Sequence, residues 1–217
     1  MFDWSVLGGS QAELIDAFYV TLALSLLSGV LSFLAGLLLC AARLKARGAV
    51  AAVLTAYVEL MRNTPLLITL YLAYFGLPMI GLQIPTFTCV VVVLVMQHAV
   101  FVSEVFRGGF LAVPASQIEA GKAIGMTPLQ IFRVVQLPQV WAASVPALIS
   151  ALMFLIHDTS LGAAISLVDL TMAAKVIAQR TAASFEPFVA IAVFYSVLSW
   201  VLSRVGSYLE RRSHIAR

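Results

Sequence analysis

The sequence predicts an all-α, polytopic membrane protein with about five transmembrane helices. Of its 217 residues, 62% are hydrophobic and only 11% are charged, whereas a soluble domain is about 45–50% apolar and about 25% charged. So few charges cannot cover a water-facing surface, which excludes a soluble globular enzyme, and the hydrophobicity excludes a disordered chain. Both cysteines, Cys40 and Cys89, lie in apolar runs and are interpreted as small buried residues rather than a disulfide or metal site.

The apolar runs set the expected spans, because a helix needs about 20 largely apolar residues to cross a bilayer. The second run is interrupted by a polar segment at 59–65. Residues 1–17 carry no basic residue and precede a run too long for a signal peptide, so they are expected to form an extracytoplasmic N-terminal segment. The expected spans are about 18–42, 50–82, 85–102, 140–156 and 188–205, with long connections at 105–138 and 157–187.

Basic residues fix the expected orientation, because cytoplasmic ends of spans carry the excess of Lys and Arg. Most Lys and Arg residues near the span ends fall on one side of the predicted topology, and the opposite side has only Lys175 and Arg180. This asymmetry predicts the N-terminus outside and the C-terminus inside. The same scatter at span edges gives no basic stripe for a phosphate backbone, so nucleic-acid binding is not expected despite a net charge of +3. The residues on the cytoplasmic side are Arg43, Lys45, Arg47, Arg107, Lys122, Arg133, Arg204, Arg211, Arg212 and Arg217.

The connection at 105–138 is predicted to hold two short amphipathic helices. Pro114 favours the start of the first, and Gly125 ends it because glycine tolerates a left-handed cap. Thr127 followed by Pro128 is a start signal for the second. Both helices are too short and polar to span, so the segment either lies on the bilayer as a linker or docks a soluble partner.

This segment resembles the EAA loop of ABC importer permeases. Its pattern is Glu-Ala-Ala, three residues, Gly, nine residues, then Ile-x-Leu-Pro. Gly121 replaces the second Ala and Val135 replaces Ile, and Gly121 is expected to loosen the first helix by up to about 1 kcal/mol. The residues at the motif positions are Glu119, Ala120, Gly121, Gly125, Leu137 and Pro138.

Other segments look like the polar amino acid subfamily of these permeases. They include 57–67, 74–78, 104–109 and 158–161, so the resemblance covers nearly the whole chain. Asn63 stands where Gly is common and His157 where Lys is common, and the sequence does not indicate how these differences affect the substrate.

The resemblance implies an importer in a bacterial inner membrane. Two permease subunits pair, identical or related; two ATPase subunits bind beneath them; and an external solute-binding protein delivers a polar amino acid. Residues 18–212 would form the transmembrane domain, with a coupling loop at about 105–138, and 213–217 a cytoplasmic tail. The chain should bind no cofactor, with ATP held by the partner ATPase, because Gly121-Lys122 lacks the rest of a Walker A motif. The alternative within this class is a permease for an opine or another amino acid derivative.

Polar residues inside the second span are candidates for the substrate pathway, since ionisable groups at membrane depth are costly. Glu59 and Arg62 are three residues apart and can pair on one helix face. Pro65 frees the carbonyl of Met61 beside Asn63 and Thr64. This segment is either a kink with nearby water or a site for the charged ends of the substrate.

A second group of candidates lies near the end of the fourth span and in the third. Asp158, Thr159 and Ser160 form either a plain N-cap or a site, where helix amides bind a carboxylate and Asp158 binds an ammonium group. Gln97 is assigned to the pathway, whereas its neighbour His98 is interpreted as a hydrogen-bonded packing residue. Glu104 and Arg107, also three apart, are expected to form a structural pair.

Two other classes are disfavoured. An intramembrane enzyme would need a nucleophile, a positioned base and an oxyanion hole, and the sequence offers only His157 and Ser160 on one short segment. A stand-alone channel or secondary carrier often has internal repeats with broken helices in both halves, and only one span here is interrupted. Five helices also enclose too narrow a path for an amino acid, which independently favours a second permease subunit.

Overall fold

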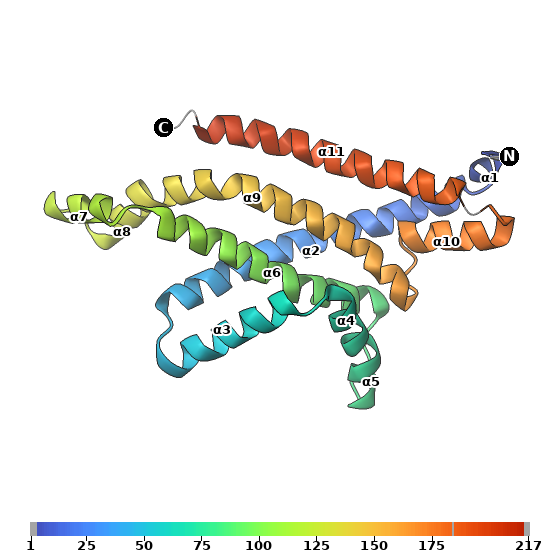
Figure 1. Ribbon diagram of the computed structural model, residues 1–217, viewed down its shortest axis with the longest axis horizontal. Coiled ribbons are helices and arrows are strands. Elements are labelled where there is room, and N and C mark those ends of the chain that lie inside the picture. The colour runs from blue at the N-terminus through green and yellow to red at the C-terminus, as the bar shows by residue number, and fades with distance from the viewer. Residues whose placement is uncertain (1–3, 184, 215–217) are drawn as a thin grey trace.

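The computed structural model describes residues 4–183 and 185–214, and all regular structure in that part of the chain is helical (Figure 1). The long helices are α2 (Gln11–Lys45), α6 (Thr86–Ala112), α9 (Leu137–Asp158) and α11 (Glu186–His214). The shorter helices are α1 (Ser5–Gly8), α3 (Gly48–Asn63), α4 (Leu66–Tyr71), α5 (Leu77–Met79), α7 (Ala115–Ala123), α8 (Pro128–Gln130) and α10 (Leu170–Thr181). Two π-helical turns, η1 (Leu72–Gly76) and η2 (Ile131–Gln136), and a 3-10 helix, η3 (Thr159–Ile165), complete the described elements. The all-α prediction is confirmed.

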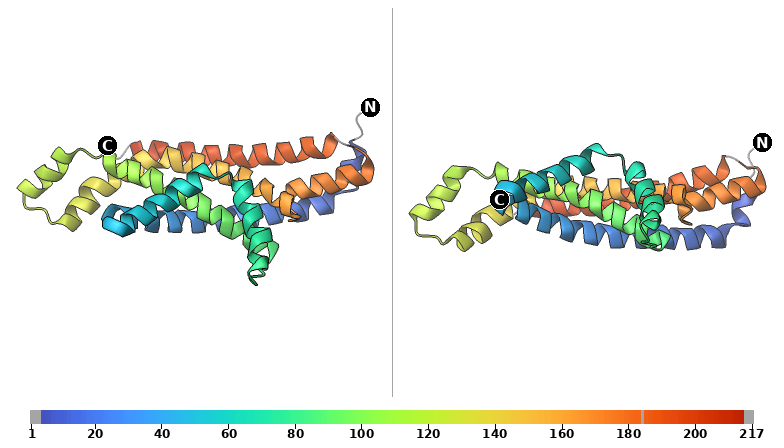
Figure 2. Two further views of the ribbon diagram at one scale, coloured as in Figure 1. Left: turned by 60° about the horizontal axis from the view of Figure 1, so that its bottom comes forward. Right: turned by 90° about the horizontal axis from the view of Figure 1, so that it is seen from below.

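The second predicted span, at 50–82, is a broken element rather than one helix. Among the described residues, four helical stretches are long and apolar enough to cross a membrane: Gln11–Lys45, Thr86–Ala112, Pro128–Ile165 and Glu186–Arg211. The second region instead consists of α3, a break at Thr64 and Pro65, and the shorter apolar stretch Leu66–Met79. Figure 2 shows α3 and the α4–α5 arm meeting at a sharp angle.

Helix boundaries differ from the predicted ones because the apolar runs end before the helices do. α2 begins at Gln11 rather than near residue 18, and α6 continues past Glu104 and Arg107 to Ala112. The coupling loop therefore starts at Val113, later than expected. The predicted N-terminal segment 1–17 and tail 213–217 both extend beyond the described residues.

Each π-helical turn is followed by a helix whose second residue is proline. Pro78 follows η1 and Pro138 follows η2. A proline has no N–H to donate to the carbonyl four residues earlier, and a wider turn accommodates the missing bond. The second predicted helix of the coupling loop therefore runs through η2 into α9 without the separate span start expected at Pro138.

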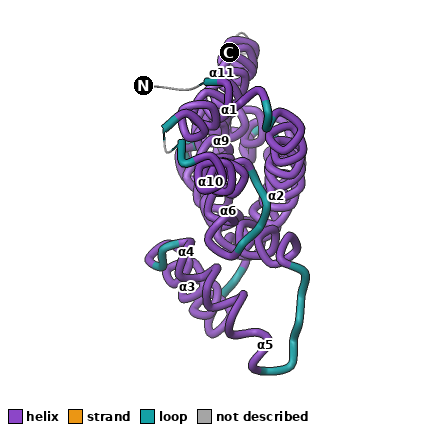
Figure 3. The backbone as a smooth tube through the Cα atoms, turned by 90° about the vertical axis from the view of Figure 1, so that its right-hand side faces the viewer, coloured by secondary structure: helices purple, strands orange, loops and turns teal. Residues whose placement is uncertain are grey.

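The two ends of the helical bundle are different. The coupling loop lies at one end with the last turn of α11, and α1 and α10 lie at the opposite end (Figures 1 and 2). Seen along the bundle, α3, α4 and α5 lie to one side of α2, α6, α9, α10 and α11 (Figure 3). α1 and the coupling loop are thus separated by the length of the bundle.

α6 is the centre of the bundle, and α2 packs on it most closely. A Cβ atom at Gly36 of α2 would lie 2.5 Å from the Cβ atom of Val102 in α6, so only glycine permits this approach. Phe33 and Phe106 add an edge-to-face contact with ring centroids 5.8 Å apart. α3 is held more loosely, by a small cluster around Val58 and Val100.

The end opposite the coupling loop contains a buried carboxylate. Asp169 is the N-cap of α10, and its Oδ1 accepts from the backbone N–H of Met172 at 2.8 Å. Its Oδ2 is buried without a hydrogen-bond partner among the described residues. Desolvation by burial is the main cause that raises the pKa of this carboxyl to about 6.

The raised pKa of Asp169 predicts a pH dependence of stability. The folded protein binds this proton more tightly than the unfolded chain, so the stabilisation is complete below the ordinary pKa of 3.8 and is lost as the pH rises through about 6. Asn at this position keeps the cap acceptor without the buried charge. We expect Asp169→Asn to melt at a higher temperature than the wild type at pH 7.5, by the equivalent of about 2–3 kcal/mol, and the difference to vanish near pH 4. Melting in detergent at both pH values measures this; a difference that does not change with pH contradicts it.

Candidate functional site

The coupling loop begins with α7 and turns as the sequence predicted. Gly125 has φ +80° and follows the end of α7, with its N–H bonded to the carbonyl of Lys122 at 3.0 Å. The N–H of Met126 bonds to the carbonyl of Gly121, also at 3.0 Å. These bonds satisfy carbonyls at the end of the helix, and the left-handed residue at the turn favours glycine.

The second helix of the loop begins with a full capping box. Thr127 Oγ1 accepts from the backbone N–H of Gln130 at 3.4 Å, and the Gln130 side chain accepts from the N–H of Thr127 at 2.7 Å. Pro128 occupies the first turn, where no N–H is needed. The start signal predicted from Thr127 and Pro128 is confirmed.

Gly121 has a packing role that the sequence did not indicate. A Cβ atom there would lie 3.1 Å from Cγ1 of Ile131, a tighter approach than side chains normally make. The departure from the second Ala of the motif therefore brings α7 close to η2. Phe110 and Phe132 stack at 6.0 Å between centroids, and Gln139 donates to Gln117 at 2.7 Å, so the loop is fastened to α6 and α9.

The tip of the coupling loop presents an exposed mixed surface. Ile124 is 79% exposed and Leu129 is 56% exposed, and the charged side chains of Glu119 and Lys122 lie on the same exposed segment. Ala120, Leu137 and Pro138 of the motif are exposed as well. Apolar and charged side chains exposed together on a fastened loop make its tip a candidate docking surface.

The break between α3 and α4 is braced by Gln97 of α6. Its Nε2 donates to the carbonyl of Met61 at 3.1 Å and to that of Thr64 at 2.8 Å. The Met61 carbonyl is the one that Pro65 deprives of its helical donor. Gln97, which the sequence assigned to the pathway, therefore supports the backbone at the break, and its Oε1 is buried with no partner among the described residues.

The polar side chains at the break do not form the expected ion pair. Asn63 donates to the carbonyl of Glu59 at 2.7 Å and to its carboxylate at 3.3 Å, and Thr64 donates to the carbonyl of Leu60 at 2.8 Å. No ion pair joins Glu59 to Arg62 in the described part of the chain, and the Glu59 carboxylate accepts from Asn63 instead. Glu59, Arg62 and Asn63 remain exposed on the surface of the single chain.

Asp158 pairs with His98 rather than capping a helix. It is the last residue of α9, and its Oδ2 lies 2.9 Å from Nε2 of His98 on α6. It makes no side-chain cap bond to η3, so the plain N-cap interpretation is wrong. The Asp158 side chain is 38% exposed, whereas that of His98 is 4% exposed. His98 is a hydrogen-bonded packing residue as predicted, and its partner is a candidate site residue.

The neighbours of Asp158 are oriented differently. Thr159 is fully buried and donates to the carbonyl of Ile156 at 2.7 Å, which makes it structural. Ser160 is half-buried. His157 contacts Ser199 of α11 at 2.8 Å, so it does not form a nucleophile–base pair with Ser160. In the described residues no group of three or more His, Cys, Asp or Glu side chains could hold a metal ion.

Successive residues of α6 bring the two candidate regions to one depth. Gln97 holds Met61 and Thr64 at the break, and His98 holds Asp158 at the end of α9. The sequence assigns Thr64, Gln97 and Asp158 to one pathway, but it does not predict the bonds that Gln97 and His98 make. Their side chains are 33–60 positions apart in the chain, and no local pattern signals such contacts.

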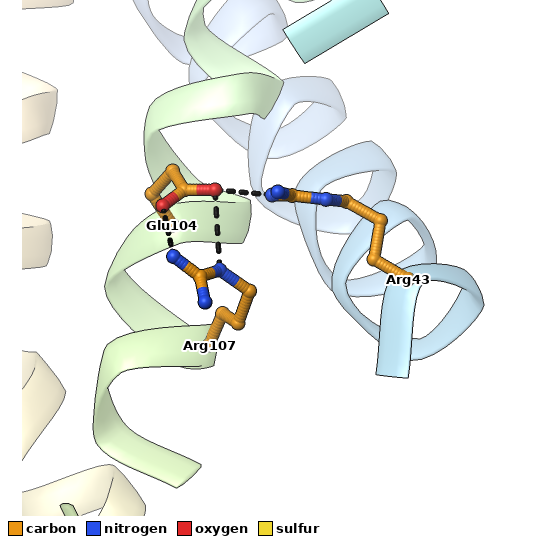
Figure 4. Close-up of polar contacts among 3 residues, drawn as sticks. All are labelled: Arg43, Glu104 and Arg107. Carbon is orange, nitrogen blue, oxygen red and sulfur yellow. Dashed lines mark hydrogen bonds and ion pairs between the residues drawn. The ribbon is translucent and has the colours of Figure 1, made fainter. Parts of the chain in front are cut away.

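A charge cluster joins α2 to α6 near the coupling loop (Figure 4). Arg107 donates to Oε2 of Glu104 at 2.8 Å, which confirms the predicted structural pair. Arg43 of α2 forms a third member through Oε1 of Glu104. The sequence indicates for Arg43 only a role in membrane orientation, because its partner Glu104 lies 61 residues away in the chain.

Comparisons with known proteins agree with this arrangement. Residues 30–215 match the family model for a binding-protein-dependent transport system inner membrane component. The chain belongs to this family. It is therefore an ABC transporter permease subunit, a transport component rather than an enzyme, as its motif residues predicted.

Individual relatives match over almost their whole length. A probable glutamine ABC transporter permease of Bacillus subtilis is 32% identical over 96% of both chains. A nopaline transport system permease of Agrobacterium fabrum is 31% identical over 93% of this chain and 88% of that protein. The permease also superposes on a crystal structure of an amino acid ABC transporter with histidines, with TM-score 0.91, 32% identity, and coverage of 98% and 99% of the two chains.

Removing the brace at the break should destabilise the permease. Gln97→Leu keeps the approximate size but leaves the carbonyls of Met61 and Thr64 without their donor. We expect a loss of about 1–3 kcal/mol in the free energy of unfolding, seen as a lower melting temperature in detergent. Gln136→Leu is the matched control, because no side-chain hydrogen bond of Gln136 is present among the described residues. Equal melting temperatures for the two variants would contradict the role assigned to Gln97.

Proposed function

We propose that this permease forms the membrane pathway of an ATP-driven importer for a polar amino acid. The observation that supports this proposal is the fastened coupling loop, which has Glu119 and Gly125 at its exposed tip and lies at the end of the bundle opposite α1. The amino acid substrate is supported by relatives whose names specify glutamine and glutamate/aspartate. ATP binds to separate ATPase subunits rather than to this chain, and this chain carries no cofactor.

The proposed assembly contains a second permease subunit, identical or related. Glu59, Arg62 and Asn63 are exposed on a single chain, and charged groups at membrane depth require a partner or a water-filled cavity. A second subunit facing α3 and α4 supplies both. The proposed pathway residues remain Glu59, Arg62, Asn63, Thr64, Gln97, Asp158, Thr159 and Ser160, with Gln97 and Thr159 acting by holding the backbone.

Asp158 is the group we assign to the ammonium end of the substrate. Its side chain is partly exposed, and the buried His98 fixes one of its oxygens at 2.9 Å. The second oxygen is then left to face the pathway. A carboxylate oriented in this way attracts a cationic group, and the low dielectric of the membrane strengthens that attraction.

The proposed orientation places the N-terminus outside and the C-terminus inside a bacterial inner membrane. The last turn of α11 and the coupling loop share one end of the bundle, and basic residues gather at the span ends on that side, as cytoplasmic segments do. Two ATPase subunits would dock there. A solute-binding protein would deliver the substrate at the opposite end, near α1 and α10.

Docking through the coupling loop predicts which variants lose the ATPase. Glu119→Lys reverses a charge at the exposed tip, and Gly125→Arg adds a bulky side chain at a left-handed residue. We expect each to reduce the ATPase recovered with the tagged permease from native membranes at least about tenfold, the equivalent of about 1.4 kcal/mol. Asp16→Lys, the same kind of change at the opposite end of the bundle, is the control. Full recovery of the ATPase with both loop variants would overturn the docking proposal.

The substrate is tested by import into proteoliposomes that hold the purified complex and its binding protein. We expect ATP-dependent uptake of a polar amino acid such as glutamine, with Asp158→Asn lowering uptake at least about tenfold through loss of one charge contact. Nopaline is the second substrate to test, because a nopaline permease is among the relatives. Uptake of nopaline without any amino acid would replace the polar amino acid with an opine.

A further inference from the structure

The charge cluster of Arg43, Glu104 and Arg107 lies where α2 ends and α6 leads into the coupling loop (Figure 4). Arg107 donates to both oxygens of Glu104, from Nη2 at 2.8 Å and from Nε at 3.3 Å. This bidentate contact within α6 fixes the carboxylate. The remaining contact of Oε1, to Arg43, therefore connects two different helices.

The cluster lies beside apolar packing that extends to the coupling loop. One buried group contains Cys40 of α2, Val102 and Phe106 of α6, Val113 just after α6, and Val140 of α9, and Ile118 of α7 packs against it. A displacement of α7 therefore reaches the inner ends of α2, α6 and α9 through side chains already in contact.

α3 depends on the inner end of α2 for its position. Only Ala46 and Arg47 separate the two helices, and Gly48 begins α3 with φ +58°. α3 contacts α6 through its small apolar cluster and through the hydrogen bond from Gln97 to Met61. Tyr57 of α3 also donates to the carbonyl of Met96 at 2.7 Å. A shift of Lys45 would therefore move the start of α3.

We propose that Glu104 is a positioning residue that transmits movement of the coupling loop to α3, by holding the end of α2 to α6 through Arg43. The inference rests on the proposed function, since it assumes an ATPase that moves the loop. It adds to that function a specific connection from the loop to the helix that carries Glu59, Arg62 and Asn63.

The environment of the bridge suits this role better than that of another ion pair in the chain. The side chains of Arg43 and Glu104 are 14% and 21% exposed, so water and salt weaken their attraction little. Arg180 and Glu13, at the opposite end, are 50% and 45% exposed, and such a pair contributes little. The two bridges thus form a matched comparison with the same chemistry.

The test measures how many substrate molecules are imported for each ATP hydrolysed by the complete reconstituted transporter. Glu104→Gln and Arg43→Gln should each lower this ratio about fivefold while substrate-stimulated hydrolysis stays near the wild-type rate. Glu13→Gln, which weakens the exposed pair, should keep the wild-type ratio. Arg43→Lys, which retains the charge but not the planar guanidinium, should give an intermediate ratio.

A double variant separates the bridge from independent effects. If Arg43 and Glu104 act through each other, Arg43→Gln combined with Glu104→Gln should lower the ratio no further than the stronger single variant. Two outcomes would overturn the proposal. Wild-type ratios with wild-type import would show that the bridge has no role in transport. Import and hydrolysis that fall in proportion would show that the bridge only stabilises the protein. If Glu104→Gln does not fold, the comparison of Arg43→Gln with Arg43→Lys decides the proposal. Failure of the proposed function itself would appear in the wild type, as absence of substrate-stimulated hydrolysis.

Discussion

The hydrogen bonds from Gln97 to the break after α3 are the contact on which the candidate pathway depends. Inside a bilayer no water satisfies a free carbonyl, so a break in a helix persists only where protein groups satisfy it. Pro65 creates the break, and the amide of Gln97 supplies donors for Met61 and Thr64. The chain can therefore expose Asn63 and its neighbours at membrane depth without leaving those two carbonyls unpaired.

α6 combines this support with the other functional contacts of the chain. Gln97 and His98 hold the break and Asp158, Glu104 holds α2, and the helix then continues to Ala112 and the coupling loop. A single continuous helix thus joins the candidate pathway to the candidate docking surface.

The sequence predicted the features that depend on neighbouring residues. Thr127, Pro128 and Gly125 specify the turn of the coupling loop through their own backbone preferences, so the prediction and the structure agree there. Contacts between distant residues were not predictable in this way. The pairs of His98 with Asp158 and of Arg43 with Glu104 join residues 60 and 61 positions apart. The apolar run predicts an end of the third span near residue 102, whereas α6 continues to Ala112 because Glu104 and Arg107 neutralise each other inside the helix.

The unequal packing of the helices indicates where the permease can change shape. α2 and α6 approach so closely at Gly36 that a single Cβ atom does not fit, and closely packed interfaces of this kind resist sliding. α3 lies to one side, attached through a few hydrogen bonds and a small apolar cluster, whereas α4 buries Leu66 and Leu70 in a larger apolar cluster with α6. Movement of α3 against the bundle therefore disturbs far less buried contact than separation of α2 from α6. The residues at the break lie between α3 and α4, so a shift of α3 changes their distance from Asp158. In a paired permease, the same shift would open or close the path between the two subunits, which is the geometry that alternating access requires.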